Sequence, residues 1–266
     1  MVGVVERRLL VNYRADPEAV ARLVPAPMRP QQVNGFAVAG ICLIRLGGLR
    51  PRHVPGVLGL RSENAAHRIA VEWDTPGGPA TGVYIPRRDS GSLVNVAVGG
   101  RLFPGLHHRA RFDSRETADE LRVGFASVDR AVSARVHVRT VDGPSVSRPA
   151  GSRSAESRPA GSRLAGSRLF GGLDEASAFF RRGAVGYSVG SDAGCLDGLE
   201  LRTNAWRVEP VEVLGAESTF FADTTLFPAG SVTLDCALLM RNVPVTWEPL
   251  PPMRTGGVAP VSAAPD

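Results

Sequence analysis

Short stretches in which apolar and polar residues alternate recur along this chain, and they limit its fold more than any other feature. Leu121, Val123 and Phe125 alternate with polar residues, and residues 132–138 repeat the pattern after a short turn. A period of two places one face of a strand on a core and the other face in water. Such strands pair in antiparallel sheets, so we expect a mainly antiparallel β protein.

Other strands are expected where apolar runs are bounded by glycine, proline or charged residues. Phe36–Leu46 is apolar almost throughout, which indicates a strand buried on both faces. Further strands are predicted at Ile69–Trp73, Gly82–Pro86, Leu93–Gly99, Trp206–Leu214 and Val232–Met240. Because helices do not alternate with these strands, the pattern favours an α+β fold over a βαβ array.

Two short helices are predicted from their ends. The first has Asp16 as its cap, Pro17 at its first position and Pro25 as its end. The second begins at Asp174 and ends at Gly183. No glycine-rich phosphate loop follows a strand, and the usual zinc-protease and serine-hydrolase motifs are absent. The sequence therefore gives no motif in favour of nucleotide binding or of the common hydrolase mechanisms.

The segment Ser147–Gly171 consists of the pentapeptides SRPAG, SRSAE, SRPAG, SRLAG and SRLFG. A five-residue period fits neither a helix nor a strand, and Pro, Gly and Ser provide no core. We expect a disordered surface loop that interrupts a single domain at residues 1–250, and a disordered tail at Pro251–Asp266. The alternative is that this arginine-rich loop recruits an acidic partner in a non-catalytic interaction protein.

The charge distribution argues against nucleic-acid binding. The net charge is +5, but the repeat segment holds five arginines and only Glu156, so the remainder is nearly neutral. No apolar run approaches the roughly 20 residues that cross a bilayer. Cys42, Cys195 and Cys236 form no CxxC pair, which favours free thiols in a reducing compartment over a metal site. We therefore expect a cytoplasmic protein without a membrane partner.

Polar residues that could carry chemistry gather near the ends of three predicted strands. They are Glu63, His67, Arg68, Tyr84, Arg87, Arg101, His107 and His108. Carboxylate and imidazole groups suit proton transfer, and arginine forks suit a carboxylate ligand. We therefore take Glu63, His107 and His108 as candidate catalytic residues, and the others as candidate ligand-binding residues that converge at one mouth of a curved sheet.

Each candidate also has a structural interpretation. The two adjacent histidines would point to opposite faces of a strand, so at most one faces a pocket. His67 with Arg68 could form a hydrogen-bonded brace, Glu63 could pair with Arg68, and Tyr84 could be a core aromatic. The spacing of Glu63 and the histidines does not support a metal centre, so we expect neither a metal nor a cofactor.

Several runs also resemble the YqjF-like family, domain of unknown function 2071, which is assigned to the acetoacetate-decarboxylase-like superfamily. The resemblance covers roughly residues 3–250. The runs that carry it are Val33–Ile41, Ser62–Val71, Gly82–Asp89, Gly100–His108 and Ala237–Asn242. It implies a cone-shaped, partly closed antiparallel β-barrel-like sheet with short flanking helices and an internal pocket. Members of the superfamily form oligomers, so the resemblance also implies a homo-oligomer.

The chain departs from the decarboxylases at the position that performs their chemistry. In those enzymes a lysine beside a second lysine forms an imine with a β-keto acid. All 31 basic residues here are arginine, and the comparable stretch after Phe103-Pro104-Gly105-Leu106 is His107-His108. Imidazole forms no stable imine. We therefore expect a protein that binds or slowly converts a small carbonyl or carboxylate compound without side-chain Schiff-base chemistry.

Overall fold

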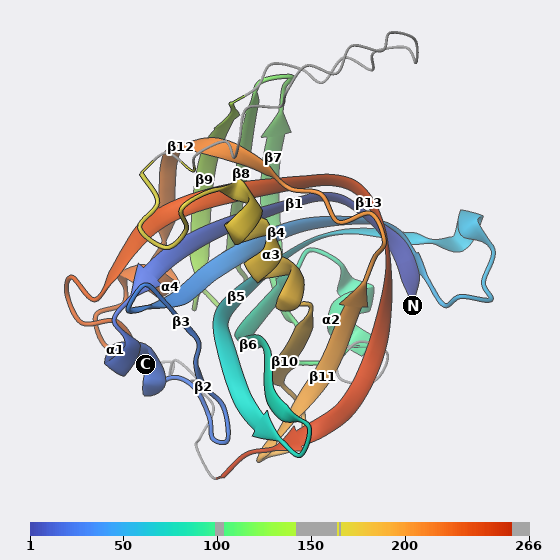
Figure 1. Cartoon of the computed structure of the whole chain (residues 1–266). Helices are drawn as coiled ribbons and strands as arrows, with labels where there is room; N and C mark the ends of the chain where they lie inside the picture. Colours follow the sequence, from blue (N-terminus) through green and yellow to red (C-terminus); the bar gives the residue numbers. More distant parts are fainter. Residues whose placement is uncertain (99–103, 142–163, 165, 257–266) are drawn as a thin grey trace, which may run out of the picture.

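The computed structural model describes residues 1–98, 104–141, 164 and 166–256 (Figure 1). In these residues a single 13-stranded sheet contains every strand. Its strands are β1 (Val2–Ala15), β2 (Arg29–Pro30), β3 (Gln32–Val33), β4 (Phe36–Arg50), β5 (Leu60–Thr75), β6 (Gly78–Ser90), β7 (His108–Glu116), β8 (Glu120–Ser127), β9 (Ser133–Thr140), β10 (Val185–Val189), β11 (Cys195–Arg202), β12 (Glu209–Ser218) and β13 (Val232–Arg254). The helices are α1 (Pro17–Ala21), η1 (Gly56–Leu58), α2 (Leu93–Val98), α3 (Leu173–Arg182) and α4 (Thr219–Ala222).

Three adjacent strands, β1, β4 and β5, are buried on both faces. Leu9 and Ile41 belong to one hydrophobic cluster, whereas Leu10 and Cys42 belong to a second cluster on the opposite face. Successive side chains of a strand point to opposite faces, so each strand supplies both clusters. This explains why the run at Phe36–Leu46 is apolar almost throughout instead of alternating.

The sheet closes on itself twice because β6 and β13 each change partner along their length. The first ring contains β5, β6, β7, β8, β9, β12, β13, β1 and β4. The second ring contains β5, β6, β10, β11, β13, β1 and β4. Five strands are therefore shared by the two rings. All pairings are antiparallel except those of β6 with β10 and with β7.

Helix α3 lies across the mouth of the second ring (Figure 1). Asp174 and Glu175 stand in its first turn and Arg181 and Arg182 in its last turn, as the helix dipole favours. Its buried face is made of Ala176, Phe179 and Phe180, which belong to the second hydrophobic cluster. The predicted helix is thus confirmed. It starts one residue early, after Gly172, which offers no side-chain cap.

The predicted α+β class and most predicted strands are confirmed, but the strand predicted at Leu93–Gly99 is wrong. Residues Leu93–Val98 form helix α2. The backbone NH of Asn95 donates to Ser92 Oγ, and the Asn95 amide donates to Ser62 Oγ and Ser90 Oγ. These anchors outweigh the β preference of the valines.

Two segments expected to be disordered are ordered in part. The repeat up to residue 163 lies outside the described residues, but Leu164, Leu169 and Phe170 are buried in the second hydrophobic cluster. The Ser167 hydroxyl and the Arg168 backbone NH donate to Asp235. At the other end, β13 continues to Arg254 by pairing with β11, so the predicted tail begins too early.

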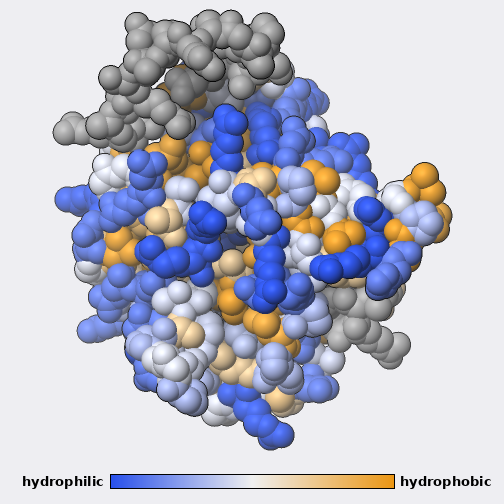
Figure 2. All heavy atoms as spheres, turned by 45° about the vertical axis from the view of Figure 1, so that its right-hand side comes forward, coloured by the Kyte–Doolittle hydropathy of each residue, from blue (hydrophilic) through white to orange (hydrophobic). Residues whose placement is uncertain are grey.

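The connection between β4 and β5 projects from the body of the molecule, at the right of Figure 1. It carries Val57 and Leu58, which are 92% and 65% exposed. Figure 2 shows hydrophobic side chains at this projecting tip on an otherwise mostly hydrophilic face. No described helix is long and apolar enough to cross a membrane.

The packing of the last repeat gives a first prediction. Substituting Phe170→Ala removes a buried ring that packs against Phe179 and Phe180, so unfolding free energy should fall by about 3–5 kcal/mol. Leu58→Ala is the matched control, with an expected change within about 0.5 kcal/mol. Urea titration measures both. Equal stability of the two variants would show that the last repeat is not part of the core.

Candidate functional site

The predicted site residues do not converge at one mouth, because the shared strands direct them into two separate interiors. On β5, Glu63 and His67 point into the first ring, whereas Arg68 points into the second. On β6, Tyr84 belongs to the first hydrophobic cluster. Arg101 lies outside the described residues. The remaining candidates divide in the same way.

Glu63 is held as a counter-ion in the first ring. Its carboxylate accepts hydrogen bonds from Arg7 Nη2 at 2.6 Å and from Arg45 Nε at 2.6 Å. The Ser114 hydroxyl donates to it at 3.3 Å. Arg7 is 1% exposed, and burial lowers the pKa of its guanidinium. Both oxygens of this carboxylate are engaged by arginines, so the geometry favours the structural role of Glu63.

His67 is enclosed by aromatic rings in the first ring of strands. Its side chain is fully buried, and its ring centroid lies 4.3 Å from that of Phe220. Burial, and secondarily the nearby Arg87, lowers the pKa of His67 to about 3. Tyr84 is also buried, and the loss of solvation raises its pKa to about 12. Both groups are therefore neutral at physiological pH.

Arg87 forms an ion-pair network where β6 meets the start of β7, and the ring of His108, whose pKa is lowered by burial, lies beside it. Arg87 donates to Asp89 at 3.0 Å and to Asp129 at 2.7 Å. His108 Nδ1 lies 3.3 Å from Asp129 Oδ2. Burial raises the pKa of Asp89 against the opposing effect of Arg87. Because Arg87 is already paired with the carboxylates of Asp89 and Asp129, we assign it a structural role and do not expect it to bind a ligand.

A different arrangement surrounds Cys42 in the second ring. Arg68 is 3% exposed, and its Nε donates to Cys42 Sγ at 3.1 Å while Nη2 donates to Asn12 Oδ1. Arg8 Nη2 donates to the same sulfur at 3.7 Å. The buried Nε of Arg8 has no hydrogen-bond partner among the described residues. Two guanidiniums therefore converge on one thiol.

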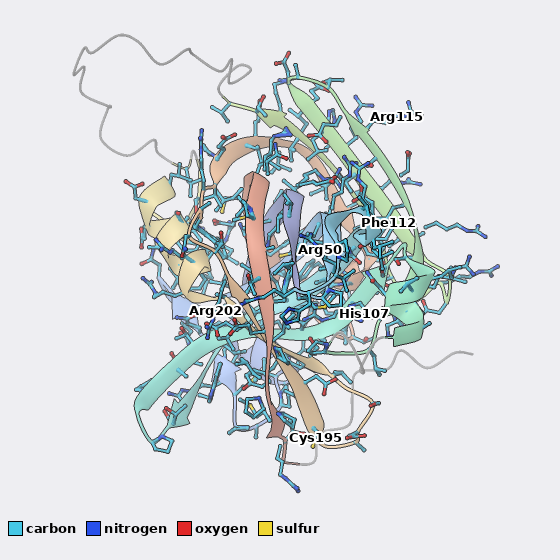
Figure 3. All side chains as sticks on the ribbon, turned by 90° about the vertical axis from the view of Figure 1, so that its right-hand side faces the viewer. Arg50, His107, Phe112, Arg115, Cys195 and Arg202 are labelled. Atoms are coloured by element: carbon cyan, nitrogen blue, oxygen red, sulfur yellow. The ribbon has the colours of Figure 1, made fainter. Side chains whose placement is uncertain are left out.

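Arg88 and His107 extend this cluster. Arg88 Nε donates to Ser188 Oγ at 2.7 Å, and desolvation lowers the pKa of Arg88 to about 10. His107 Nδ1 lies 3.0 Å from the Gly105 carbonyl, so this nitrogen carries the proton and Nε2 carries the lone pair of the neutral ring. Burial, then the charge of Arg88, lowers the pKa of His107 to about 4. Figure 3 shows His107 on the inner side of the start of β7, whereas Arg115 of that strand points outward.

Two glycines make room for these side chains. A Cβ at Gly40 would lie 2.5 Å from the Val11 carbonyl oxygen and 3.1 Å from Arg68 Nη2. Gly105 has φ +91°, and a Cβ there would lie 2.6 Å from the Cβ of Ser188. A larger residue at either position would displace Arg68 or Arg88.

The cluster of Arg8, Arg68 and Arg88, which we call the guanidinium cluster, has an excess of positive charge. None of the three forms an ion pair within the described part of the chain, and Asp197 acts on Arg88 only from a distance. Burial opposes ionisation of the Cys42 thiol, but the combined effect of Arg68 and Arg8 lowers its pKa. Buried cations require an anion nearby. The arrangement suits a carboxylate, which guanidinium forks bind through paired hydrogen bonds.

The space beside the cluster is small in this structure. A cavity of about 10 Å³ lies between Arg8, Arg68 and the α3 residues Phe179 and Phe180. The Phe180 ring centroid is 4.8 Å from the Arg68 guanidinium carbon. The described residues contain no group of three or more metal-ligating side chains.

The sequence pointed to Arg68 and His107 but not to Arg8, Arg88 or Cys42. Arg8 lies in β1, which was not predicted because Glu6, Arg7 and Arg8 interrupt the apolar pattern. A usable signal existed for Arg88, since residues 87 and 88 of an extended strand face opposite sides.

Comparisons with known proteins relate this geometry to known folds. A family described as an uncharacterised conserved protein, domain of unknown function 2071, matches residues 5–159. No curated protein matches the sequence. An acetoacetate-decarboxylase-like enzyme from Sphingomonas wittichii RW1 has a TM-score of 0.54 at 11% identity, over 96% of this chain and 93% of its own.

Two further solved structures have the same fold. A structure of acetoacetate decarboxylase has a TM-score of 0.52 at 14% identity, over 94% of this chain and 89% of its own. The enduracididine biosynthesis enzyme MppR, complexed with pyruvate, has a TM-score of 0.50 at 14% identity, over 93% and 89%. At these identities the likeness establishes a mainly antiparallel α+β fold similar to that of acetoacetate-decarboxylase-like proteins.

The contacts of Glu63 give a second prediction. Glu63→Gln leaves the buried Arg7 charge without its closest partner, so unfolding free energy should fall by about 3–5 kcal/mol. Glu72→Gln, which breaks an exposed pair with Arg29, is the control and should cost at most about 1 kcal/mol. Chemical denaturation compares them. A near-neutral Glu63→Gln variant would contradict the structural role.

A third prediction concerns pH. The pKa values of His67 and His107 are lowered to about 3 and about 4, so the unfolded chain binds protons more readily than the folded protein. Their stabilising contribution is complete above about pH 6.5 and is lost as pH falls toward 4. Between pH 7 and 5 each should lower the unfolding free energy by about 1–2 kcal/mol. His67→Phe should remove that part of the pH dependence in urea titrations, whereas exposed His53→Gln should not; equal slopes would refute this assignment.

Proposed function

We propose that this chain, which belongs to the family of uncharacterised conserved proteins called domain of unknown function 2071, binds a small carboxylate at the guanidinium cluster. The observation that carries the proposal is the convergence of Arg8 and Arg68 on Cys42, with Arg88 nearby on Ser188, without a carboxylate in ion-pair contact with any of the three among the described residues. The family assignment confirms the resemblance noted in the sequence. A bound carboxylate would supply the missing negative charge.

The chemistry of the cluster supports a carboxylate over a neutral ligand. Placing the buried guanidinium of Arg68 beside the half-buried guanidiniums of Arg8 and Arg88 is unfavourable unless each is paired or hydrogen-bonded, and a carboxylate offers two acceptor oxygens. The MppR enzyme of the same fold is complexed with pyruvate, a small 2-oxo acid. Small 2-oxo acids are therefore the first ligands to test.

The absence of lysine determines which chemistry accompanies binding. No side-chain amine is present to form an imine with a bound ketone, so the route of a lysine Schiff-base decarboxylase is closed. We place His107, which burial and the charge of Arg88 keep neutral, beside the ligand as the group for proton transfer. Binding, or slow proton transfer without a covalent intermediate, is the function that this set of residues supports.

We further infer the setting in which this function operates. The two closed strand rings support the partly closed, barrel-like sheet that the family resemblance implies. The three cysteines are free thiols, as a reducing cytoplasm would keep them. Self-association as a homo-oligomer is carried over from the superfamily by analogy.

Isothermal titration of the purified protein with pyruvate tests the proposal. We expect saturable binding that is lost with the uncharged ester methyl pyruvate. Arg68→Gln should weaken binding by about tenfold or more, because a charged hydrogen bond contributes about 1.5–3 kcal/mol. Arg29→Gln, at an exposed pair, is the matched control and should leave binding unchanged.

A second measurement on the same samples separates binding from imine chemistry. Borohydride added to the pyruvate complex should add no mass to any side chain, because no lysine is available. If neither pyruvate, acetate nor 2-oxobutyrate binds at 10 mM or below, on the order of the weakest specific affinities, the carboxylate assignment is wrong.

A further inference from the structure

Phe180 is the aromatic residue that contacts the guanidinium cluster directly. It is 6% exposed, and its ring lies over Arg68 with 4.8 Å between the ring centroid and the guanidinium carbon. A cation over the face of an aromatic ring is attracted by the ring quadrupole. The ring therefore covers one face of the guanidinium and borders the edge at which a carboxylate would bind.

The volume beside Phe180 shows why this position matters. The cavity of about 10 Å³ holds at most one water molecule, so a three-carbon acid does not fit in it. Its wall opposite the arginines includes Gly82, Val83 and Gly183, together with the rings of Phe179 and Phe180. The two phenylalanine rings are the largest apolar groups among these, and the ring of Phe180 is the one that lies over Arg68.

The attachment of α3 is consistent with movement of this ring. The helix is flanked by Gly172 and Gly183, and its N-terminus has no side-chain cap. A polar tie to the rest of the chain is the hydrogen bond from Trp206 Nε1 to Ser177 Oγ at 3.1 Å. Apolar packing of Phe179 and Phe180 otherwise seats the helix in the mouth of the second ring.

We propose that Phe180 is the specificity-determining residue of the site, because its ring takes the space that the part of the ligand beyond the carboxylate requires. This inference rests on carboxylate binding at the guanidinium cluster. Small 2-oxo acids enter when the ring turns away from Arg68, and longer side chains are excluded by it. Phe170 packs against Phe179 and Phe180 and is the matched aromatic, because it is buried in the same cluster but does not line the cavity beside Arg68.

The test compares the full-length wild type with Phe180→Ala, Phe180→Leu and Phe170→Ala. Dissociation constants are measured by titration with pyruvate, 2-oxobutyrate, 4-methyl-2-oxopentanoate and phenylpyruvate. Removing a buried ring opens a cavity of roughly 100–150 Å³. Phe180→Ala should therefore shift the ratio of affinities toward the two larger acids by at least about tenfold, Phe180→Leu should shift it less, and Phe170→Ala, which removes a ring outside the cavity wall, should keep the wild-type ratio.

Stability is measured in parallel, because both alanine variants remove a core ring and should be destabilised to a similar extent. A general structural role of α3 would lower all affinities together in both variants and leave the ratio unchanged, and that outcome overturns the proposal. If the wild type binds pyruvate but the size profile does not change in Phe180→Ala, only the role of Phe180 fails. If no variant binds any of the four acids, the carboxylate function itself fails.

Discussion

The burial of both faces of β1, β4 and β5 is the constraint on which the rest of this structure depends. The central residues of these strands are enclosed by one of two rings, so a charged side chain there needs a partner within its own ring. Arg7 obtains Glu63 on one side. Arg8 and Arg68 on the other side have a thiol instead of a carboxylate. The interior of the first ring therefore contains a carboxylate for its buried arginine, whereas the described residues of the second ring provide none for Arg8 and Arg68.

The sequence allowed much of this architecture to be predicted, because local patterns reflect local burial. The apolar run at Phe36–Leu46 indicated a doubly buried strand, and β4 is one. β1 could not be predicted in the same way, because its central Arg7 is buried through a partner 56 residues away. The valines of α2 favour a strand, and the side-chain anchors of Asn95 that override this preference come from distant residues.

The types of residue at the site were predicted better than their arrangement. Glu63, His67 and Arg68 were all identified from one short run, and the parity of a strand already separates the first two from the third. A single sequence does not reveal that both faces of β5 are enclosed. The alternation of side chains along β5 therefore places them in two interiors instead of in one pocket and in solvent. The contribution of Cys42 depends on the same pairing, since β4 places it beside β5.

Because two rings share these strands, the register in which the strands pair determines which side chains face each of the two interiors. In an ordinary sheet, a slip of one residue exchanges a dry face for a wet one. Here a one-residue slip of β5 would transfer Arg68 into the aromatic chamber around Phe220 and bring His67 to Cys42. An insertion or deletion within β4 or β5 would therefore rearrange the side chains of both interiors at once, so a change in chain length is better tolerated in the connections between strands.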